Sequence, residues 1–457
     1  MIKFLFFDWR EIESAPGFTR VFEPPTKDAA NPVFIPDAPW ENGSMSLYGS
    51  VVKAPDRPFQ LWYSSGGHLC YAESDDGLSW IRPRLDRFPM DGQPTNRVFE
   101  RPHGAAVIFD PTDPHEDWRY KLLAGAAPSS CICAFHSPDG IRWESAVRTR
   151  RSSDPFPVIG TNPDCPIGFL RTVTGQYVAY HRWPHYHRRV CRSESWDFLT
   201  WTNERRMVLE PDAGDPPQVQ FYGMGVAPYG SYELGTLWTY HTIANDMDPQ
   251  KMVGGYQQAE LAYSRSGWAW HRAAQGTPFI PHGESGTWEQ GSLQCASQPV
   301  FLEDEIRYYY AASTAFHGSR RVGTVGRGGL GVARLKPDRF FALVAGDAPA
   351  ELTTYVFDLK STDVYVNART GSSGRLRVEL LDVAGQPIPG FTEADCTPIS
   401  GDSLRHRARW RGDGQTAAPI GQRARLRLTA RDASLYSIYV TEPGEVPVYH
   451  RFEAARP

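Results

Sequence analysis

A short turn that ends in tryptophan recurs along the chain and indicates the period of the fold. It reads SDDGLSW at 74–80 and SPDGIRW at 137–143. Two looser copies, SESWDFLTW and SRSGWAW, occupy 193–201 and 264–270, so the closing tryptophans are 63, 58 and 69 residues apart. A unit that repeats in this way is typical of architectures built from copies of one supersecondary structure.

The segments around each turn are strand-like. Apolar, β-branched or aromatic runs precede the four copies, namely HLCYAE, CICAFH, RRVCR and AELAY. The Asp-Gly pair of the first two copies supplies the positive φ that a hairpin turn needs. Two more such runs lie upstream in each unit, for example YGSVVKA and FQLWYSS in the first. Four strands per unit is the pattern of a β-propeller blade.

A fifth unit lacks the tryptophan turn. The run SLQCASQPVFLEDEIRYYYAAS predicts two strands around an EDE turn, and GGLGVARLKPDRF predicts a third. After Phe341 the chain changes to alternating strands with ordinary turns, which indicates a β-sandwich. We therefore predict an all-β chain, with a five-bladed β-propeller over 1–345 and a C-terminal β-sandwich over 346–457. The N-terminal run IKFLFFD predicts a strand that could join either domain.

Composition agrees with this fold and excludes some partners. The chain has 41 glycines, 38 prolines and 13% aromatic residues, which suits many short strands joined by turns. A net charge of -4, with no long run of Lys or Arg, argues against nucleic acid. No stretch approaches the length of a signal-peptide core or a membrane span. We predict a cytoplasmic protein with no membrane partner, which could form a homo-oligomer.

Cysteine and histidine patterns do not predict a metal site. The seven cysteines lie mostly in strand runs, where they behave as small buried apolar residues and suit a reducing compartment. Cys131 and Cys133 share a strand face, but no matching pair completes a zinc site. His181, His185 and His187 have no carboxylate or cysteine between them, which favours a ligand-contacting loop. We expect neither a metal nor a cofactor.

The chemistry of a propeller concentrates where the innermost strands of all blades meet at one end of the central channel. Residues just before these strands are distant in sequence but close in space. Four blades carry an acid there, and we predict these acids as candidate catalytic carboxylates: Glu41, Glu100, Asp164 and Glu289. Glycoside cleavage needs one protonated carboxyl and one ionised carboxylate, whose pKa values neighbouring acids split apart. A solvated loop acid is the alternative at each position.

Aromatic and basic residues near the same strand ends predict a carbohydrate partner. Aromatic rings stack on sugar faces, and Arg and His bind hydroxyl groups. We predict the following residues for substrate binding: Trp40, Tyr48, Arg101, His103, Arg182, Tyr222, His241 and Trp288. Neither a GxSxG elbow nor a phosphate-binding loop occurs.

The Ser-x-Asp-Gly-x-x-Trp turn, the two-domain layout and the acidic strand starts resemble the five-bladed propeller glycoside hydrolases, which include the arabinanase/β-xylosidase and β-fructosidase groups. The resemblance implies three carboxylates that act as base or nucleophile, pKa modulator and general acid. By blade position these would be Glu41, Glu100 and Asp164, with Glu289 as a further candidate. The fructosidase NDPNG box is absent where ENGSMSLYG stands, and RDP does not occur, so we predict a divergent member.

Three functions fit these residues. The first is a glycoside hydrolase that cleaves a furanoside or short oligosaccharide with a carboxylate pair. The second is a polysaccharide lyase or other sugar-modifying enzyme, with a Tyr or His base near an Arg that neutralises a uronate; Tyr48, His103, Arg101 and Tyr222 could serve. The third is a non-catalytic carbohydrate-binding propeller. We predict the hydrolase, and the separation of two carboxylates would discriminate among the three.

Overall fold

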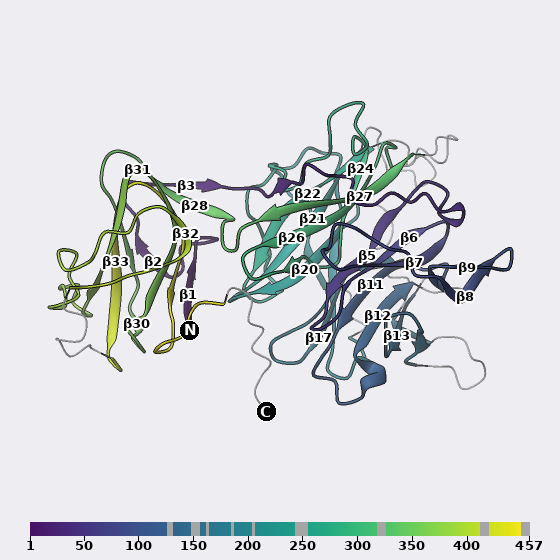
Figure 1. Ribbon diagram of the computed structural model, residues 1–457, viewed down its shortest axis with the longest axis horizontal. Helices are drawn as coiled ribbons and strands as arrows, with labels where there is room; N and C mark the ends of the chain where they lie inside the picture. The colour runs from purple at the N-terminus through teal and green to yellow at the C-terminus, as the bar shows by residue number, and fades with distance from the viewer. Residues whose placement is uncertain are drawn as a thin grey trace. The chain divides into compact units, whose positions relative to one another are not determined.

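The computed structural model describes residues 1–125, 131–147, 156–160, 164–183, 187–202, 206–242, 255–317, 326–411 and 420–448 (Figure 1). Regular structure in these residues is almost entirely β-strand, and their helices are two short 3-10 turns, η1 (Pro39–Glu41) and η2 (Glu116–Trp118). The all-β prediction is confirmed. Neither described helix is long and apolar enough to cross a membrane. The chain forms two compact units, and each is described by itself.

In the described part of the larger unit, five antiparallel sheets form the blades of a propeller, as predicted. Blade one runs outward through β5 (Ser46–Lys53), β6 (Phe59–Ser65), β7 (His68–Ser74) and β10 (Arg97–Glu100). Blade two contains β11 (His103–Phe109), β12 (Tyr120–Gly125), β13 (Ile132–Ser137), β14 (Glu144–Ser145) and β15 (Pro157–Ile159). Blade three contains β16 (Asp164–Arg171), β17 (Tyr177–Arg182), β18 (Val190–Ser195) and β19 (Arg206–Leu209).

Blade four contains β20 (Val219–Tyr229), β21 (Tyr232–Thr242), β22 (Gly255–Ser264) and β23 (His271–Arg272). Blade five contains β24 (Ser292–Cys295), β25 (Val300–Phe301), β26 (Ile306–Ser313), β27 (Gly328–Leu335) and β4 (Thr26–Lys27). A separate hairpin, β8 (Leu85–Met90) and β9 (Gln93–Thr95), is inserted before β10. The inner strands form a ring, because β11 contacts β5 and β16, β16 contacts β20, and β24 contacts β5 and, in blade four, β21 and β22.

The ring is closed by a strand that the sequence reading missed. β4 pairs with β27, with Lys27 opposite Ala333 and Thr26 opposite Arg334. The outer edge of blade five is therefore supplied by the start of the propeller chain. Two residues are too short for a hydrophobic pattern, so nothing local in the sequence predicts this strand.

The repeated turn is held by its serine and aspartate. The Ser74 hydroxyl accepts the backbone N–H of Gly77 at 2.8 Å and donates to the Asp76 carboxylate at 2.9 Å. The same carboxylate accepts the N–H groups of Leu78 and Ser79, each at 2.7 Å. These hydrogen bonds explain why the residue types recur at a fixed spacing.

The third copy of the turn begins later than its sequence suggests. We expected it to start at Ser193, whereas the capping serine is Ser195, which donates to Asp197 at 3.0 Å. Phe198 takes the glycine position with a φ of 67°, and it is buried against Trp201. The buried contact with Trp201 thus stabilises a backbone conformation that glycine adopts more readily than phenylalanine.

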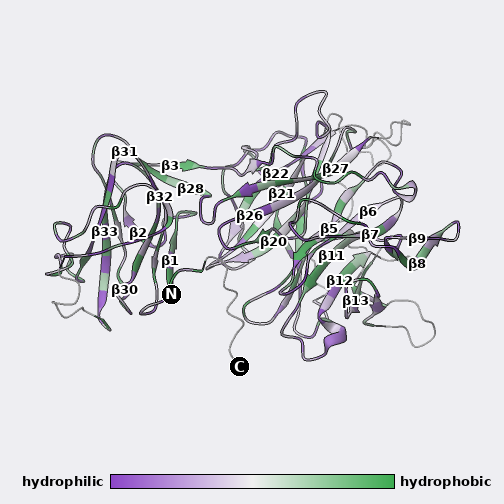
Figure 2. Ribbon diagram, in the orientation of Figure 1, coloured by the Kyte–Doolittle hydropathy of each residue, from purple (hydrophilic) through white to green (hydrophobic). Residues whose placement is uncertain are grey.

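Neighbouring blades pack through apolar residues and through buried ion pairs. Between blades one and two, for example, Trp62, Tyr71, Val107, Tyr120 and Leu122 belong to one buried cluster. Figure 2 shows hydrophobic segments along β11 and β12 and hydrophilic ones elsewhere on the ribbon. The cores of the propeller therefore lie between its sheets.

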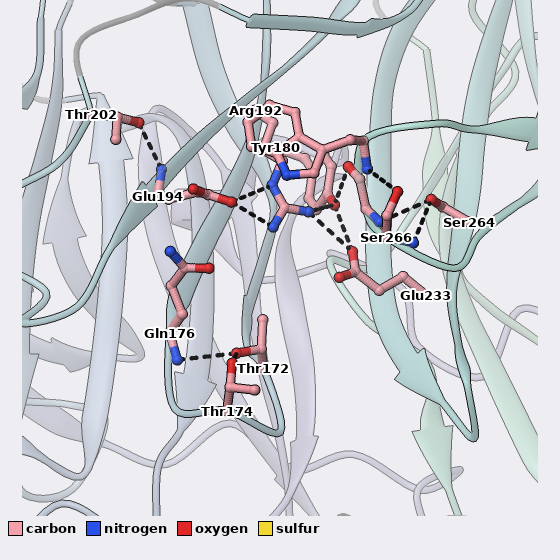
Figure 3. A network of polar contacts seen from close by, with 12 residues as sticks. Thr172, Thr174, Gln176, Tyr180, Arg192, Glu194, Thr202, Glu233, Ser264 and Ser266 are labelled. Atoms are coloured by element: carbon pink, nitrogen blue, oxygen red, sulfur yellow. Dashed lines mark hydrogen bonds and ion pairs between the residues drawn. The ribbon is translucent and has the colours of Figure 1, made fainter.

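Blades three and four are also joined by a polar network (Figure 3). Arg192 binds Glu194 at 2.7 Å and donates to the Tyr180 hydroxyl at 2.7 Å, and Tyr180 in turn donates to Glu233 at 2.6 Å. The serines of the fourth repeated turn, Ser264 and Ser266, lie beside this network in Figure 3. Both acids of the network therefore have structural partners.

The smaller unit is one hydrogen-bonded sheet of nine strands within the described residues. They are β1 (Ile2–Leu5), β2 (Ile12–Ser14), β3 (Phe18–Phe22), β28 (Phe341–Ala345), β29 (Ala350–Thr354), β30 (Phe357–Asp358), β31 (Val364–Leu381), β32 (Asp402–Arg407) and β33 (Arg423–Val440). β33 pairs with β31 along its length, and with β30, β29, β28 and β1 in succession. The layered sandwich stays a prediction.

The N-terminal strand joins this smaller unit. β1 pairs with the end of β33, and Lys3 forms a buried ion pair with Asp338 at 2.6 Å. Tyr439 and Ser437 donate to the same carboxylate. The unit comprises residues 1–24, 303–305 and the described residues from Leu335 onward, so its limits differ from the division at 345 that we drew from the sequence.

Candidate functional site

Inner strands and their neighbours bring three aromatic rings together at the channel. Tyr48 of β5 lies with its ring centroid 6.5 Å from that of Tyr222 in β20, and 5.7 Å from that of Trp238 in β21. Tyr222 and Trp238 are 6.4 Å apart and nearly parallel, with an interplanar angle of 19°. The rings come from blades one and four, so only closure of the propeller places them side by side.

Two arginine side chains lie over the Tyr222 ring. The guanidinium carbon of Arg182 is 4.3 Å from the ring centroid, and that of Arg188 is 5.0 Å from it. Arg188 also lies 5.4 Å from the Tyr240 ring and donates to the Gln220 amide oxygen at 2.6 Å. Both arginines are within the range of a cation–π contact.

A histidine from blade five connects two of the tyrosines. The Nε2 atom of His317 lies 3.0 Å from the Tyr222 hydroxyl, and its Nδ1 atom lies 3.2 Å from the Tyr240 hydroxyl. A neutral imidazole donates through one nitrogen and accepts through the other, so the hydrogen-bonded series Tyr222, His317 and Tyr240 can relay a proton. His317 follows the second strand of its blade, the same blade position that led us to Arg182 and His241.

A cysteine, a histidine and an arginine form the next part of the site. The Cys165 sulfur lies 3.6 Å from Nε2 and 3.7 Å from Nδ1 of His103, and 3.8 Å from an Nη atom of Arg182. Cys165 has a positive φ of 27° at the start of β16. Asp164 precedes it, and its backbone is opposite Arg182 in the β16–β17 register.

We name these residues the channel cluster: Tyr48, His103, Cys165, Arg182, Arg188, Tyr222, Trp238, Tyr240 and His317. Burial raises the pKa of Tyr48 well above its ordinary value, and the Tyr222 phenol adds to this increase. Tyr48 therefore stays protonated and can donate a hydrogen bond. Burial lowers the pKa of Arg188, and the nearby Arg182 charge lowers it further.

Glu41 lies in a different environment within blade one. Its side chain is fully buried, and one carboxylate oxygen accepts from Tyr63 and from Nε of Arg82 at 3.0 Å. The other oxygen accepts from Nη2 of Arg82 at 3.0 Å and from the N–H of Ala38 at 2.8 Å. Trp40 next to it donates to Asn96 at 2.7 Å. A bidentate, enclosed ion pair of this kind favours a structural role.

Glu289 and Trp288 form a second cluster in blade five. The carboxylate of Glu289 accepts from the Tyr310 hydroxyl at 2.8 Å and pairs with Lys27 at 2.8 Å, while its side chain remains 14% exposed. The Trp288 ring stacks on that of Tyr310 at 6.1 Å. Burial, followed by the Glu289 charge, raises the pKa of Tyr310.

Glu100 and Arg101 lie at the end of β10, directly before β11. Both are exposed, and the backbone N–H of Arg101 donates to the carbonyl of Gly67 at 3.1 Å. Exposure of this kind is also what the alternative of a solvated loop acid predicts, so a catalytic role for Glu100 stays a prediction.

His241 lines a small cavity. Its ring stacks on Tyr256 at 4.6 Å with an interplanar angle of 7°, and burial lowers its pKa. The cavity has a volume of about 230 Å³ and is lined by Pro216, Pro217, Gln218, Val219, His241 and Thr242. A neutral imidazole, an amide and a hydroxyl beside proline rings suit a small polar ligand.

The structure thus brings together four of the residues predicted for substrate binding, Tyr48, His103, Arg182 and Tyr222, with the backbone of Asp164 beside them. Sequence reasoning missed the other five residues of the cluster, which are Cys165, Arg188, Trp238, Tyr240 and His317. In the part of the chain that the structure describes, no group of three His, Cys, Asp or Glu residues could hold a metal ion, and all seven cysteines are free thiols.

Comparisons with known proteins are distant. No protein-family model matches the chain, and no curated protein matches it. Among solved structures, the chain is similar to an N-acetylgalactosamine deacetylase from F. plautii, with 13% identity over 70% of this chain and 96% of that one and a TM-score of 0.47. It is similar to a glycosyl hydrolase from Bacteroides ovatus, with 13% identity over 69% and 94% and a TM-score of 0.46. A β-1,2-mannobiose phosphorylase from Listeria innocua shows 12% identity over 68% and 96%, with a TM-score of 0.44. Function is therefore argued from the site itself.

Proposed function

We propose that this protein is a carbohydrate-active enzyme whose substrate binds at the channel cluster. The observation that carries the proposal is the convergence of Tyr48, Tyr222 and Trp238 with Arg182 and Arg188 in the propeller channel. Aromatic surfaces with a few fixed polar groups are the usual lining of a small-molecule site. Flat rings suit the apolar faces of sugars, and guanidinium groups and phenols bind sugar oxygens.

For the reaction, we propose hydrolysis of a furanoside or a short oligosaccharide by two carboxylates. Asp164 is the first candidate, because it directly precedes Cys165 and its backbone is opposite Arg182. In the carboxylate pair of a glycosidase, one group is ionised and acts as nucleophile or base. Glu289 is the preferred second candidate, because its side chain remains partly exposed whereas that of Glu41 is enclosed. Glu100 is exposed and remains a further candidate.

The test is release of reducing sugar from a panel of aryl glycosides and short oligosaccharides. We expect Asp164→Asn and Glu289→Gln each to lower kcat by at least about a hundredfold, the size expected for loss of an acid or base. Glu284→Gln, in the exposed loop that precedes Glu289, is the matched control and should keep full activity. Full activity in Asp164→Asn and Glu289→Gln, or no sugar release from the whole panel, would exclude this carboxylate pair.

A second candidate is a lyase or another sugar-modifying enzyme that uses Tyr, His and Arg. It is favoured by the short contact between His317 and the Tyr222 hydroxyl, with Arg182 over the same ring. An unsaturated product detected by absorbance, together with loss of activity in Tyr222→Phe, would support it over hydrolysis. Saturable sugar binding without any product would instead indicate a non-catalytic binding propeller.

A further inference from the structure

Part of the wall of the small cavity in blade four is a rigid segment. Pro216 and Pro217 stand before β20, and the N–H of Val219 donates to the carbonyl of Pro216 at 3.0 Å. The hydroxyl and the N–H of Thr242, at the end of β21, donate to the carbonyl of Gln218 at 3.1 Å and 3.4 Å. Because proline fixes φ and these hydrogen bonds join the segment to β21, the wall is formed before a ligand binds.

His241 forms another part of the wall, and its neighbours fix its ring. The ring stacks on Tyr256, and its Nε2 atom lies 3.3 Å from the Thr239 hydroxyl and 3.4 Å from the Gln258 amide nitrogen. Within the described residues, its Nδ1 atom forms no hydrogen bond, so this atom is available to a ligand. Burial lowers the pKa of His241, and the His282 charge lowers it further, so the imidazole is neutral at neutral pH.

The chemistry of the lining fits an uncharged, hydroxylated ring. The lining residues are two prolines, a glutamine, a valine, a threonine and the neutral His241, so none of them offers a counter-charge to an ion. Burial of an ion without such a partner is costly. The Gln218 amide and the imidazole each provide a donor and an acceptor, as sugar hydroxyl groups do. The proline rings and Val219 provide apolar surface for the C–H groups of a sugar.

The size of the cavity fits one sugar unit. Its volume is about 230 Å³. This exceeds the roughly 15 Å³ that one water molecule needs, and it is below the roughly 300 to 1,000 Å³ of sites for drug-sized ligands. A single ring with its hydroxyl groups lies between these limits.

The cavity is next to the channel cluster in both strands that form it. His241 directly follows Tyr240 of that cluster in β21, and Val219 directly precedes Gln220, which accepts a hydrogen bond from Arg188. Successive side chains of a strand point to opposite faces of the sheet. The cavity is therefore a position distinct from the cluster, at the same end of these two strands.

We propose that this cavity is a subsite for one uncharged sugar unit of an oligosaccharide substrate, which His241 and Gln218 bind through its hydroxyl groups. This inference rests on the proposed function, because the carbohydrate class of the ligand is taken from it. It adds a second binding position to the one at the channel cluster.

Occupation of the cavity is measured at His241 itself, by carbethoxylation of the full chain with diethyl pyrocarbonate and peptide mass spectrometry. The reagent acylates neutral imidazole nitrogens, so a bound sugar should protect this residue. The probes are the methyl glycosides of glucose, galactose, mannose, xylose and arabinofuranose. At about ten times the Kd of a probe, about a tenth of the sites stay empty, so the reaction should slow about tenfold. His115, which is exposed before η2, is the internal control and should react at an unchanged rate.

Two further probes and two variants define the ligand and its contacts. Methyl glucuronoside, which is anionic, and glycerol, which has no ring, should each protect His241 only at higher concentrations than the best uncharged glycoside. Gln218 is exposed, and its amide forms no hydrogen bond within the described residues, so Gln218→Ala should fold normally. This variant should raise the concentration for half-protection about threefold to tenfold, the effect of one lost neutral hydrogen bond. Gln93→Ala, at an exposed glutamine of β9, is the matched control and should behave like the wild type.

The outcomes separate this inference from the proposed function. If no uncharged glycoside protects His241, if glycerol protects equally well, or if Gln218→Ala leaves protection unchanged, the inference is overturned even when aryl glycosides are hydrolysed. A His241 that does not react in the absence of sugar is closed to solvent, which also overturns it. Protection by a glycoside in a protein that cleaves none of the sugars supports the subsite and contradicts the enzyme proposal.

Discussion

Arg182 lies 4.3 Å above the ring of Tyr222, although the two residues belong to different blades. Arg182 ends the second strand of blade three, and Tyr222 is near the start of the first strand of blade four. The contact exists because strand ends and strand starts meet at the same end of a blade. A site in this protein is therefore assembled from equivalent positions of successive repeats.

We predict that the sugar stacks on the Tyr222 ring. Tyr222→Ala removes a buried ring that contacts Trp238 and two guanidinium groups, so it should lower stability by about 3 to 5 kcal/mol and abolish sugar binding. Tyr222→Phe keeps the ring and should bind sugar within about threefold of the wild type. Thermal unfolding and a sugar titration measure both effects. Normal binding in Tyr222→Ala would show that the sugar lies elsewhere.

The ion pair between Glu41 and Arg82 is predicted to stabilise the fold. Glu41→Gln leaves Arg82 without its buried partner and should cost about 3 to 5 kcal/mol in denaturant unfolding. Asp37 contacts the same Arg82 nitrogen at 3.0 Å, but its side chain is 74% exposed. Asp37→Asn is the matched control and should cost less than about 1 kcal/mol. A stable but inactive Glu41→Gln protein would instead indicate a catalytic role for Glu41.

Cys165 is predicted to be more reactive than other buried thiols. The His103 ring and the Arg182 guanidinium contact its sulfur, and neighbours of this kind make a cysteine more reactive, whereas burial raises the pKa of Cys70 and of Cys295. Alkylation followed by peptide mass spectrometry should label Cys165 before these two. His103→Ala should slow labelling at this position alone. Equal rates at all three thiols would contradict the prediction.

The repeated turns are predicted to make the propeller sensitive to acid. Backbone N–H groups of Ser79 and Leu78 hold the pKa of Asp76 well below its ordinary value. A lowered folded-state pKa stabilises the fold above the unfolded-state pKa of about 3.9, and this stability is lost as the pH falls below it.

Thermal unfolding between neutral pH and about pH 2 tests this dependence, since that window spans the unfolded-state pKa. Asp76→Ser imitates the fourth turn, where Ser266 accepts the same kind of backbone N–H groups without a charge. This variant should fold and lose about 1 kcal/mol at neutral pH, a typical value for a lost cap. Its Tm should fall less steeply with acid than that of the wild type, and an unchanged slope would exclude Asp76 as a contributor.

The blades could be read from the sequence because their signals are local. The Ser74, Asp76 and Gly77 hydrogen bonds need only neighbouring residues, so the same residue types recur wherever the turn is formed. The start of the third copy of the turn was placed at Ser193 instead of Ser195, because Phe198 replaces the glycine there. Burial of its ring, and not an intrinsic conformational preference, maintains its positive φ. Closure through β4 was missed because a two-residue strand has no pattern of its own.

The candidate site could be predicted only in part, because many of its contacts join residues that are distant in the sequence. Equivalence of blade positions was enough to predict Tyr48, His103, Arg182 and Tyr222, because the repeat determines which strand ends share the channel. The partners of each charged group depend on long-range packing. Glu41 meets Arg82 and Glu289 meets Lys27, and neither contact follows from spacing along the chain.

The sequence by itself therefore determined the repeat, the all-β class and the blade positions from which a site is drawn, since these depend on turn chemistry and strand periodicity. Only the tertiary structure decided that Arg188 and His317 join Tyr222, and that Glu41 is enclosed in an ion pair. The physical reason is that hydrogen bonds in turns act over a few residues, whereas the charge and burial of a side chain depend on every strand that packs around it.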